Sequence, residues 1–336
     1  MKLKILIART DRLGDVLLAL PALAYIRRAI PEAEIDFLCR LDVGDVIRPT
    51  LDALRIQTLF LPDGDKLKFV KKYAACLFLF WEERLCKAAF WSNIPIRMGI
   101  YSKPLSYLLL NSGIRQHRSL ARKNEALYNL DLARKLLSKL GFNEELPIDE
   151  KMTLETDEMS KRRAEQTLAQ HALTKSNFII VHPGMGGSAL NVSAENYIEI
   201  IQKLKESGEE VVLSLGPLPI DQGLGTRIQA KIPGLKVVQG LTLPALREFF
   251  RLAKVVLAPS TGPLHLAHLV GTKTVGIFSP VLSHSMVRWA PWGGSGESLT
   301  LSPQVPCPAK QDCLGDACEY FPCMDKADWV NLIGKI

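Results

Sequence analysis

Residues 3–15 have the sequence LKILIARTDRLGD, in which an apolar run from Leu3 to Ala8 leads into a polar loop with a single glycine. The apolar run predicts a buried β-strand, and the spacing of apolar residues from Val16 to Ala29 predicts an amphipathic helix. A glycine in such a loop lets the backbone approach a ligand closely, and the start of the next helix offers unpaired N–H groups. This segment therefore predicts a β–loop–α unit with a ligand-binding loop.

The rest of the chain repeats this alternation, which is typical of an α/β protein with parallel sheets. Two long helices interrupt it, one predicted at Leu120–Leu140 before Gly141 and one at Asp157–Gln170. The further predicted strands are Ile35–Cys39, Ala74–Phe80, Phe178–Val181, Glu210–Leu215, Lys236–Gln239, Val255–Ala258 and Thr274–Phe278. An apolar helical face at Ala327, Val330, Leu332 and Ile333 predicts a packed helix within Asp325–Ile336.

We therefore expect two Rossmann-like, doubly wound domains with parallel sheets that face a central cleft, where open α/β sheets bind ligands. The expected division is an N-terminal domain at 1–155, a linker helix region at 156–175, a second domain at 176–300, and a cysteine-rich tail with a terminal helix at 301–336.

The composition limits the class of protein. The chain has 336 residues, 47% hydrophobic and 23% charged, which is typical of a globular protein. It contains no run of about 18 apolar residues and no signal peptide, so we expect a cytoplasmic protein. The net charge of +7 favours anionic partners, but the dispersed basic residues, with modest clusters at 66–72 and 115–123, carry no nucleic-acid motif. Nucleic acid is therefore not an expected partner.

The seven cysteines fall into two groups. Cys39, Cys76 and Cys86 have apolar neighbours and are expected to be buried thiols. The other four lie in a proline-rich segment with no Cys-x-x-Cys pair, so a structural zinc site and reduced thiols both remain open. These four are Cys307, Cys313, Cys318 and Cys323.

The first loop holds a candidate catalytic carboxylate. Asp15 is interpreted either as a residue that caps the following helix or as a general base that takes the proton of an attacking hydroxyl. Asp11 is the rival base, and together with Arg9 and Arg12 it is a candidate for binding an acceptor. Gly14 is the only glycine in the loop, so a dinucleotide-binding Gly-x-Gly-x-x-Gly motif is absent.

Two later turns are candidate anion-binding sites. The sequence VHPGMGGS at 181–188 follows a strand, and its glycines allow main-chain N–H groups to converge on a phosphate; a plain glycine-rich connection and a buried strand-end His182 are the alternatives. The sequence APSTGPLH at 258–265 joins a strand to a helix with proline at its start, which suits a diphosphate. There the alternative is that Ser260 or Thr261 only caps the helix, although two histidines, His265 and His268, lie nearby.

Taken together, three separated motifs resemble glycosyltransferase family nine, the ADP-heptose:lipopolysaccharide heptosyltransferases. They are DRLGD at 11–15 with LPAL at 20–23, HPG at 182–184, and STGPLH at 260–265 followed by GTKTV at 271–275. The resemblance implies a GT-B fold and inverting transfer from a nucleotide-diphosphate sugar, with ADP-heptose as donor and no required metal. It further implies an anionic lipopolysaccharide-core glycolipid as acceptor, met at the inner face of the cytoplasmic membrane.

The family's catalytic aspartate falls on Asp15. The resemblance places donor contacts at Gly14, His182, Gly184, Gly186, Gly187, Ser188, Gly216, Ser260, Thr261, Gly262 and His265, with Asp221 near the donor ribose. The leaving phosphate would then be stabilised by main-chain donors and the helix terminus at Gly262.

The sequence departs from the family pattern at two places. Many heptosyltransferases have aspartate where this chain has Ser260, and a lysine or arginine where it has Leu190 and Asn191. Loss of a cation beside a diphosphate removes a charge-assisted contact that contributes about 1.5–3 kcal/mol to donor binding. Either the donor differs from ADP-heptose, or another basic group such as Arg9 or Arg288 substitutes. A nucleotide-sugar epimerase or hydrolase on the same fold, and a non-catalytic nucleotide- or glycan-binding homologue, are the alternative functions.

Overall fold

The structure, a computed structural model, describes residues 2–61, 73–144, 146–148, 151–187 and 189–334. The chain forms two compact units. Unit 1 comprises Met1–Arg118 and Glu125–Glu155, and unit 2 comprises Ser119–Asn124 and Thr156–Ile336. No helix in these described ranges is long and apolar enough to cross a membrane.

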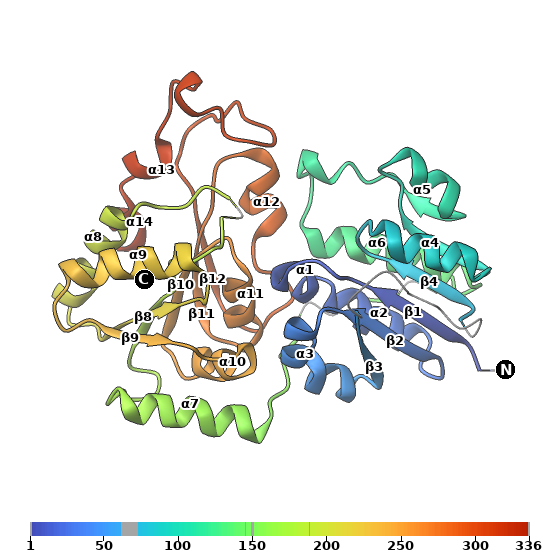
Figure 1. Cartoon of the computed structure of the whole chain (residues 1–336), viewed down its shortest axis with the longest axis horizontal. Helices are drawn as coiled ribbons and strands as arrows, with labels where there is room; N and C mark the ends of the chain where they lie inside the picture. Colours follow the sequence, from blue (N-terminus) through green and yellow to red (C-terminus); the bar gives the residue numbers. More distant parts are fainter. Residues whose placement is uncertain (1, 62–72, 145, 149–150, 188, 335–336) are drawn as a thin grey trace. The chain divides into compact units, whose positions relative to one another are not determined.

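Unit 1 is built on a six-stranded sheet in which every described pairing is parallel (Figure 1). Its strand order is β3-β2-β1-β4-β5-β6, the order of a doubly wound Rossmann sheet. The strands are β1 (Lys4–Ala8), β2 (Glu34–Cys39), β3 (Ile56–Phe60), β4 (Ala75–Phe78), β5 (Ile96–Ile100) and β6 (Ser112–Ile114). The helices are α1 (Leu13–Leu17), α2 (Leu20–Ala29), α3 (Leu41–Ala53), α4 (Glu83–Trp91), α5 (Pro104–Leu109) and α6 (Glu125–Lys139), of which α2 packs against α6.

Unit 2 repeats the same design. Its sheet order, β12-β11-β10-β7-β8-β9, is the unit 1 order in reverse listing, and its pairings are also parallel. The strands are β7 (Ile179–Val181), β8 (Val211–Leu215), β9 (Lys236–Gln239), β10 (Val255–Pro259), β11 (Lys273–Ile277) and β12 (Ser298–Leu301). The helices are α7 (Glu158–Gln170), α8 (Ala194–Glu206), α9 (Pro219–Lys231), α10 (Leu243–Arg251), α11 (Gly262–Leu269), α12 (Met286–Trp289), α13 (Cys323–Lys326) and α14 (Trp329–Ile333). Short 3₁₀ turns lie at Leu282–His284 and Gly315–Ala317 in unit 2, and at Arg118–Leu120, where the chain passes from unit 1 to unit 2.

The strand order fixes where each unit can bind a ligand. In unit 1 the direction of winding reverses between β1 and β4, and in unit 2 it reverses between β7 and β10. Ligands of open α/β sheets bind at the carboxyl ends of the strands at such a reversal point. The loop after β1 and the turns after β7 and β10 lie at these points, which are the three segments singled out from the sequence.

Three predicted helices differ from the structure. The helix expected at Val16–Ala29 is two helices, α1 and α2. Pro21 has no backbone N–H to donate to the carbonyl four residues earlier, so one helix ends and a new one starts. The long helix expected from Leu120 begins only at Glu125, after a 3₁₀ turn and a left-handed Ala121 (φ 42°). The C-terminal helix is divided into α13 and α14.

The segment at 156–175, expected as a linker, packs within unit 2. Helix α7 lies against α10, and its N-cap Asp157 pairs with the fully buried Arg247 at 2.9 Å. The tail also joins this unit, since Trp329 is 1% exposed in the core around β7, β8 and α8. The side chains of Leu332 and Ile333 lie outside what the structure describes.

Candidate functional site

Asp15 lies in the first turn of α1 and its carboxylate is held by an arginine. Nη2 of Arg9 donates to Oδ1 of Asp15 at 2.6 Å, and the Asp15 side chain keeps 17% of its exposure. Gly14 beside it is buried, and Arg12, the N-cap of α1, makes no side-chain capping bond and is exposed. The carboxylate is thus paired with a cation while part of it stays accessible.

Arg9 was expected to bind the acceptor. Its side chain lies in the interior of unit 1 and not on a binding surface. It is 2% exposed, and its N–H groups donate to Asp11, Asp15, Glu125 and Asn129 and to the carbonyl of Leu79. Although burial opposes the charge, the surrounding carboxylates raise the pKa of Arg9 above its usual value. A guanidinium with its donors so used has none left for an acceptor, so of the three residues expected to bind it, Arg12 and Asp11 stay predictions.

Asp11 is the second carboxylate of the loop. Its Oδ1 accepts from Nε of Arg9 at 2.8 Å. Burial and the nearby Asp15 carboxylate raise the pKa of Asp11 to about 6, against the opposing effect of Arg9. Both carboxylates of this loop therefore bond the same guanidinium, which also pairs with Glu125.

The glycine-rich turn after β7 is occupied by a carboxylate of the protein itself. Asp221, in the first turn of α9, accepts from the N–H groups of Met185 (3.2 Å) and Gly186 (3.3 Å) through Oδ1. A Cβ on Gly184 would lie 2.7 Å from Cγ of Asp221, and one on Gly216 would lie 3.1 Å from its Oδ2. Asp221, expected near the donor ribose, is thus 7% exposed and packs onto this turn. Two N–H groups expected to bind a phosphate are already paired.

Other residues of this turn have separate places. Gly186 and Gly187 have positive φ angles of 58° and 69°, which glycine adopts without strain. His182 is buried, with Nδ1 3.2 Å from Oγ of Ser214, and burial lowers its pKa to about 4. It therefore occupies the buried strand-end position that was the alternative to donor contact. Ser188 lies outside the described residues.

Asn191 also supports this turn. Its Nδ2 donates to the carbonyl of Pro183 at 2.7 Å, and its Oδ1 accepts from Tyr197 at 3.0 Å. Many family members carry a cation at this position, whereas Asn191 stabilises the turn in this chain.

The segment between β10 and α11 offers half-buried polar groups at a helix start. Thr261 occupies the N-cap position of α11, yet its side chain makes no capping hydrogen bond. Its hydroxyl therefore does not cap the helix, which was the alternative to diphosphate binding. Ser260, Thr261 and Gly262 are all partly exposed. His265, one turn on, is 4% exposed with an unpartnered Nδ1, and burial, together with His268, lowers its pKa to about 3.

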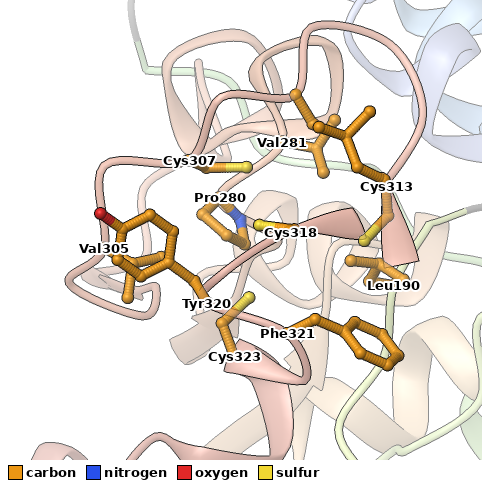
Figure 2. Close-up of a pocket in the computed structure, with 12 residues that line it drawn as sticks. Leu190, Pro280, Val281, Val305, Cys307, Cys313, Cys318, Tyr320, Phe321 and Cys323 are labelled. Carbon is orange, nitrogen blue, oxygen red and sulfur yellow. The ribbon is translucent and has the colours of Figure 1, made fainter. Parts of the chain in front are cut away.

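The four C-terminal cysteines line one small apolar cavity of about 10 Å³ in unit 2, together with Leu190, Tyr320 and other side chains (Figure 2). Their thiols are free. Within the described ranges, no three Cys, His, Asp or Glu side chains are gathered as a metal site requires. Structural zinc at Cys307, Cys313, Cys318 and Cys323 stays an untested prediction.

Two Rossmann-like units with parallel six-stranded sheets make up a GT-B fold, and solved structures share this fold. A glycosyltransferase family 9 structure from Veillonella parvula matches with a TM-score of 0.72 at 19% identity, covering 90% of this chain and 87% of that one. The E. coli ADP-heptose LPS heptosyltransferase II matches with a TM-score of 0.68 at 19% identity, covering 89% and 90%.

The sequence comparisons give the family. A model of glycosyltransferase family 9 (heptosyltransferase) matches residues 87–317, more than two thirds of the chain. The chain belongs to this family and is a glycosyltransferase. It is 28% identical to a Haemophilus influenzae protein described as a glycosyltransferase, over 89% of each chain, and 22% identical to the E. coli lipopolysaccharide heptosyltransferase 3, over 84% of each. The family match begins after the Asp15 loop.

Proposed function

We propose that this protein is an inverting heptosyltransferase that moves heptose from ADP-heptose to a lipopolysaccharide-core or related glycolipid. Family membership supports sugar transfer, and relatives are named as enzymes of lipopolysaccharide heptose transfer. Solved relatives include an E. coli heptosyltransferase with ADP. The net charge of +7 suits an anionic acceptor, met at the inner face of the cytoplasmic membrane.

The single observation that carries the chemistry is the accessible carboxylate of Asp15. A sugar hydroxyl must lose its proton as it attacks the anomeric carbon, and Asp15 takes that proton as general base. Its Oδ1 is engaged by Arg9, which leaves Oδ2 for this task. The anomeric carbon–phosphate bond breaks as the new glycosidic bond forms, and the nucleoside diphosphate leaves with the electron pair.

The donor diphosphate is assigned to the start of α11. Ser260 and Thr261 offer hydroxyls there, and the helix start offers a partial positive charge. Because Asp221 already pairs with Met185 and Gly186, the turn at Gly184–Gly187 contributes less of the phosphate binding than its glycines predict. No metal ion is needed in this scheme, since dipoles and hydroxyls stabilise the leaving phosphate.

A thermal-shift panel tests the donor. ADP-heptose at a hundred times its dissociation constant stabilises the fold by about 2.7 kcal/mol, which is a rise in Tm of about 5–10 °C for a unit of this size. ADP serves as the positive control, and UDP-N-acetylglucosamine as the mismatched donor. A shift with the mismatched donor alone would reject ADP-heptose. Sugar release without acceptor would indicate a hydrolase instead.

A further inference from the structure

The guanidinium of Arg9 is a buried charge of unit 1 with hydrogen bonds from all three of its nitrogens. Its Nε donates to Asp11 (2.8 Å), its Nη2 to Asp15 (2.6 Å) and Glu125 (3.2 Å), and its Nη1 to Glu125 (3.2 Å) and Asn129 (3.1 Å). Nη1 also donates to the carbonyl of Leu79 at 3.0 Å, just after β4.

The edge of the guanidinium that faces the loop is divided between two carboxylates. Nε and Nη2 form the pair of donors that an arginine commonly gives to a single carboxylate. Here Nε bonds Asp11 and Nη2 bonds Asp15, each through one oxygen. Asp15 is therefore fixed by one oxygen while its other oxygen stays available.

The other side of the guanidinium is fixed by α6. Glu125 is fully buried and also pairs with Arg118, and Asn129 is fully buried as well. Asn129 in turn donates from Nδ2 to the carbonyl of Leu18 at 3.1 Å, at the end of α1. Hydrogen bonds thus connect α6 to Arg9 and Arg9 to Asp15 on α1. A further bond connects Asn129 of α6 directly to the end of α1.

We propose that Arg9 is a positioning residue that fixes the orientation of the Asp15 carboxylate for proton abstraction, through the planar fork of its guanidinium rather than through its charge. This inference rests on the proposed role of Asp15. A lysine has the same charge but three donors on one nitrogen, so it cannot reach acceptors on opposite sides of the group at once. Misplacement of a catalytic group by about 1 Å costs about 100-fold in rate.

The test is Arg9→Lys, with Arg27→Lys as the matched control. Arg27 is also a buried arginine of unit 1, 7% exposed, and its guanidinium bonds only main-chain carbonyls, those of Pro31, Ala33, Leu54 and Arg55. Both variants keep the charge and lose buried hydrogen bonds, but only Arg9→Lys loses bonds to carboxylates. Transfer is measured as kcat and as KM for ADP-heptose, across a range of pH.

Arg9→Lys is expected to lower kcat by about 10–100-fold with KM for the donor unchanged. Arg27→Lys lowers Tm but leaves kcat unchanged at each pH. If Arg9→Lys does not fold, Glu125→Gln keeps the side-chain shape, loosens the same guanidinium and is expected to change kcat in the same direction.

The two hypotheses fail separately. Wild-type kcat at each pH in a folded Arg9→Lys protein, with transfer lost in Asp15→Asn, would overturn the positioning role alone. Full transfer by Asp15→Asn would overturn the proposed function of Asp15 and this inference with it. Equal effects of Arg9→Lys and Arg27→Lys would show that Arg9 only stabilises the fold.

Discussion

Replacing Gly184 with alanine tests how the glycine-rich turn of unit 2 is built. The new Cβ would lie 2.7 Å from Cγ of Asp221 and 2.9 Å from its Oδ2, far inside the 3.5–4.0 Å of an ordinary contact. Asp221 is buried and bonds the N–H groups of Met185 and Gly186. The carboxylate must therefore move and give up these bonds.

The expected cost follows from those two bonds. Each is a bond to a charged acceptor, and at 3.2–3.3 Å we take the low end of the range, about 1.5 kcal/mol each. Gly184→Ala should therefore destabilise unit 2 by about 3 kcal/mol and lower its Tm by about 6–12 °C. Asp221→Ala should cost about the same, because it removes the same bonds.

The double variant gives the decisive comparison. Without the carboxylate the alanine at 184 has no such clash, so the double variant should be about as stable as Asp221→Ala alone. This is a coupling energy of about 3 kcal/mol by a double-mutant cycle. Gly223→Ala is the control, since Gly223 is an exposed residue of the same helix, α9, and its Cβ would meet nothing within 4 Å. Additive losses in Tm would refute this account of the turn.

Three further predictions concern stability. Burial lowers the pKa of His182 to about 4, so the unfolded chain binds one more proton at this residue as the pH falls from 6.5 to 4. Buried His265 adds to the loss of unfolding free energy over this window; in urea denaturation the loss should be about 3 kcal/mol smaller in His182→Gln than in the wild type. Trp329→Ala removes a side chain that is 1% exposed and bonds the carbonyl of Met324, which should cost about 3–5 kcal/mol by the same assay; no loss would mean that the tail is not docked. Arg247→Met leaves the buried Glu248 with Arg251 as its remaining arginine and releases Asp157. We expect the free energy of unfolding to fall by about 3 kcal/mol and hydrogen exchange in α7 to become faster; unchanged exchange would contradict the packing of α7.

The fold followed from the sequence where local signals were strong. Apolar runs predicted the central strands β1, β2, β4, β7, β8, β10 and β11 within a residue or two, because fully buried parallel strands read as continuous apolar segments. The central strand β5 was missed, because Arg97 and Gly99 interrupt its apolar run. The edge strands β3, β6 and β12 were missed, since they are only partly buried and their runs are short. Pro21, which has no backbone N–H, is the sequence signal for the break between α1 and α2.

The site was predictable as a set of loops but not as a set of contacts. Glycines and hydroxyls after the strands marked three turns, and the strand order carries these turns to the reversal points. The bond from Arg9 to Glu125 spans 116 residues, and the bond from Asp221 to Met185 spans 36, so neither pairing has a local signal. Both buried pairings changed the expected role of a residue: Arg9 supports a carboxylate, and Asp221 holds a turn.

The central claim, that Asp15 is the base of a sugar transfer, is tested most directly by single-turnover transfer from ADP-heptose in wild type, Asp15→Asn and Asp11→Asn, with donor affinity measured in parallel. We expect Asp15→Asn to slow transfer by about 100–10,000-fold while the donor Kd stays within about twofold. Unimpaired transfer in Asp15→Asn, or its loss only in Asp11→Asn, would contradict it.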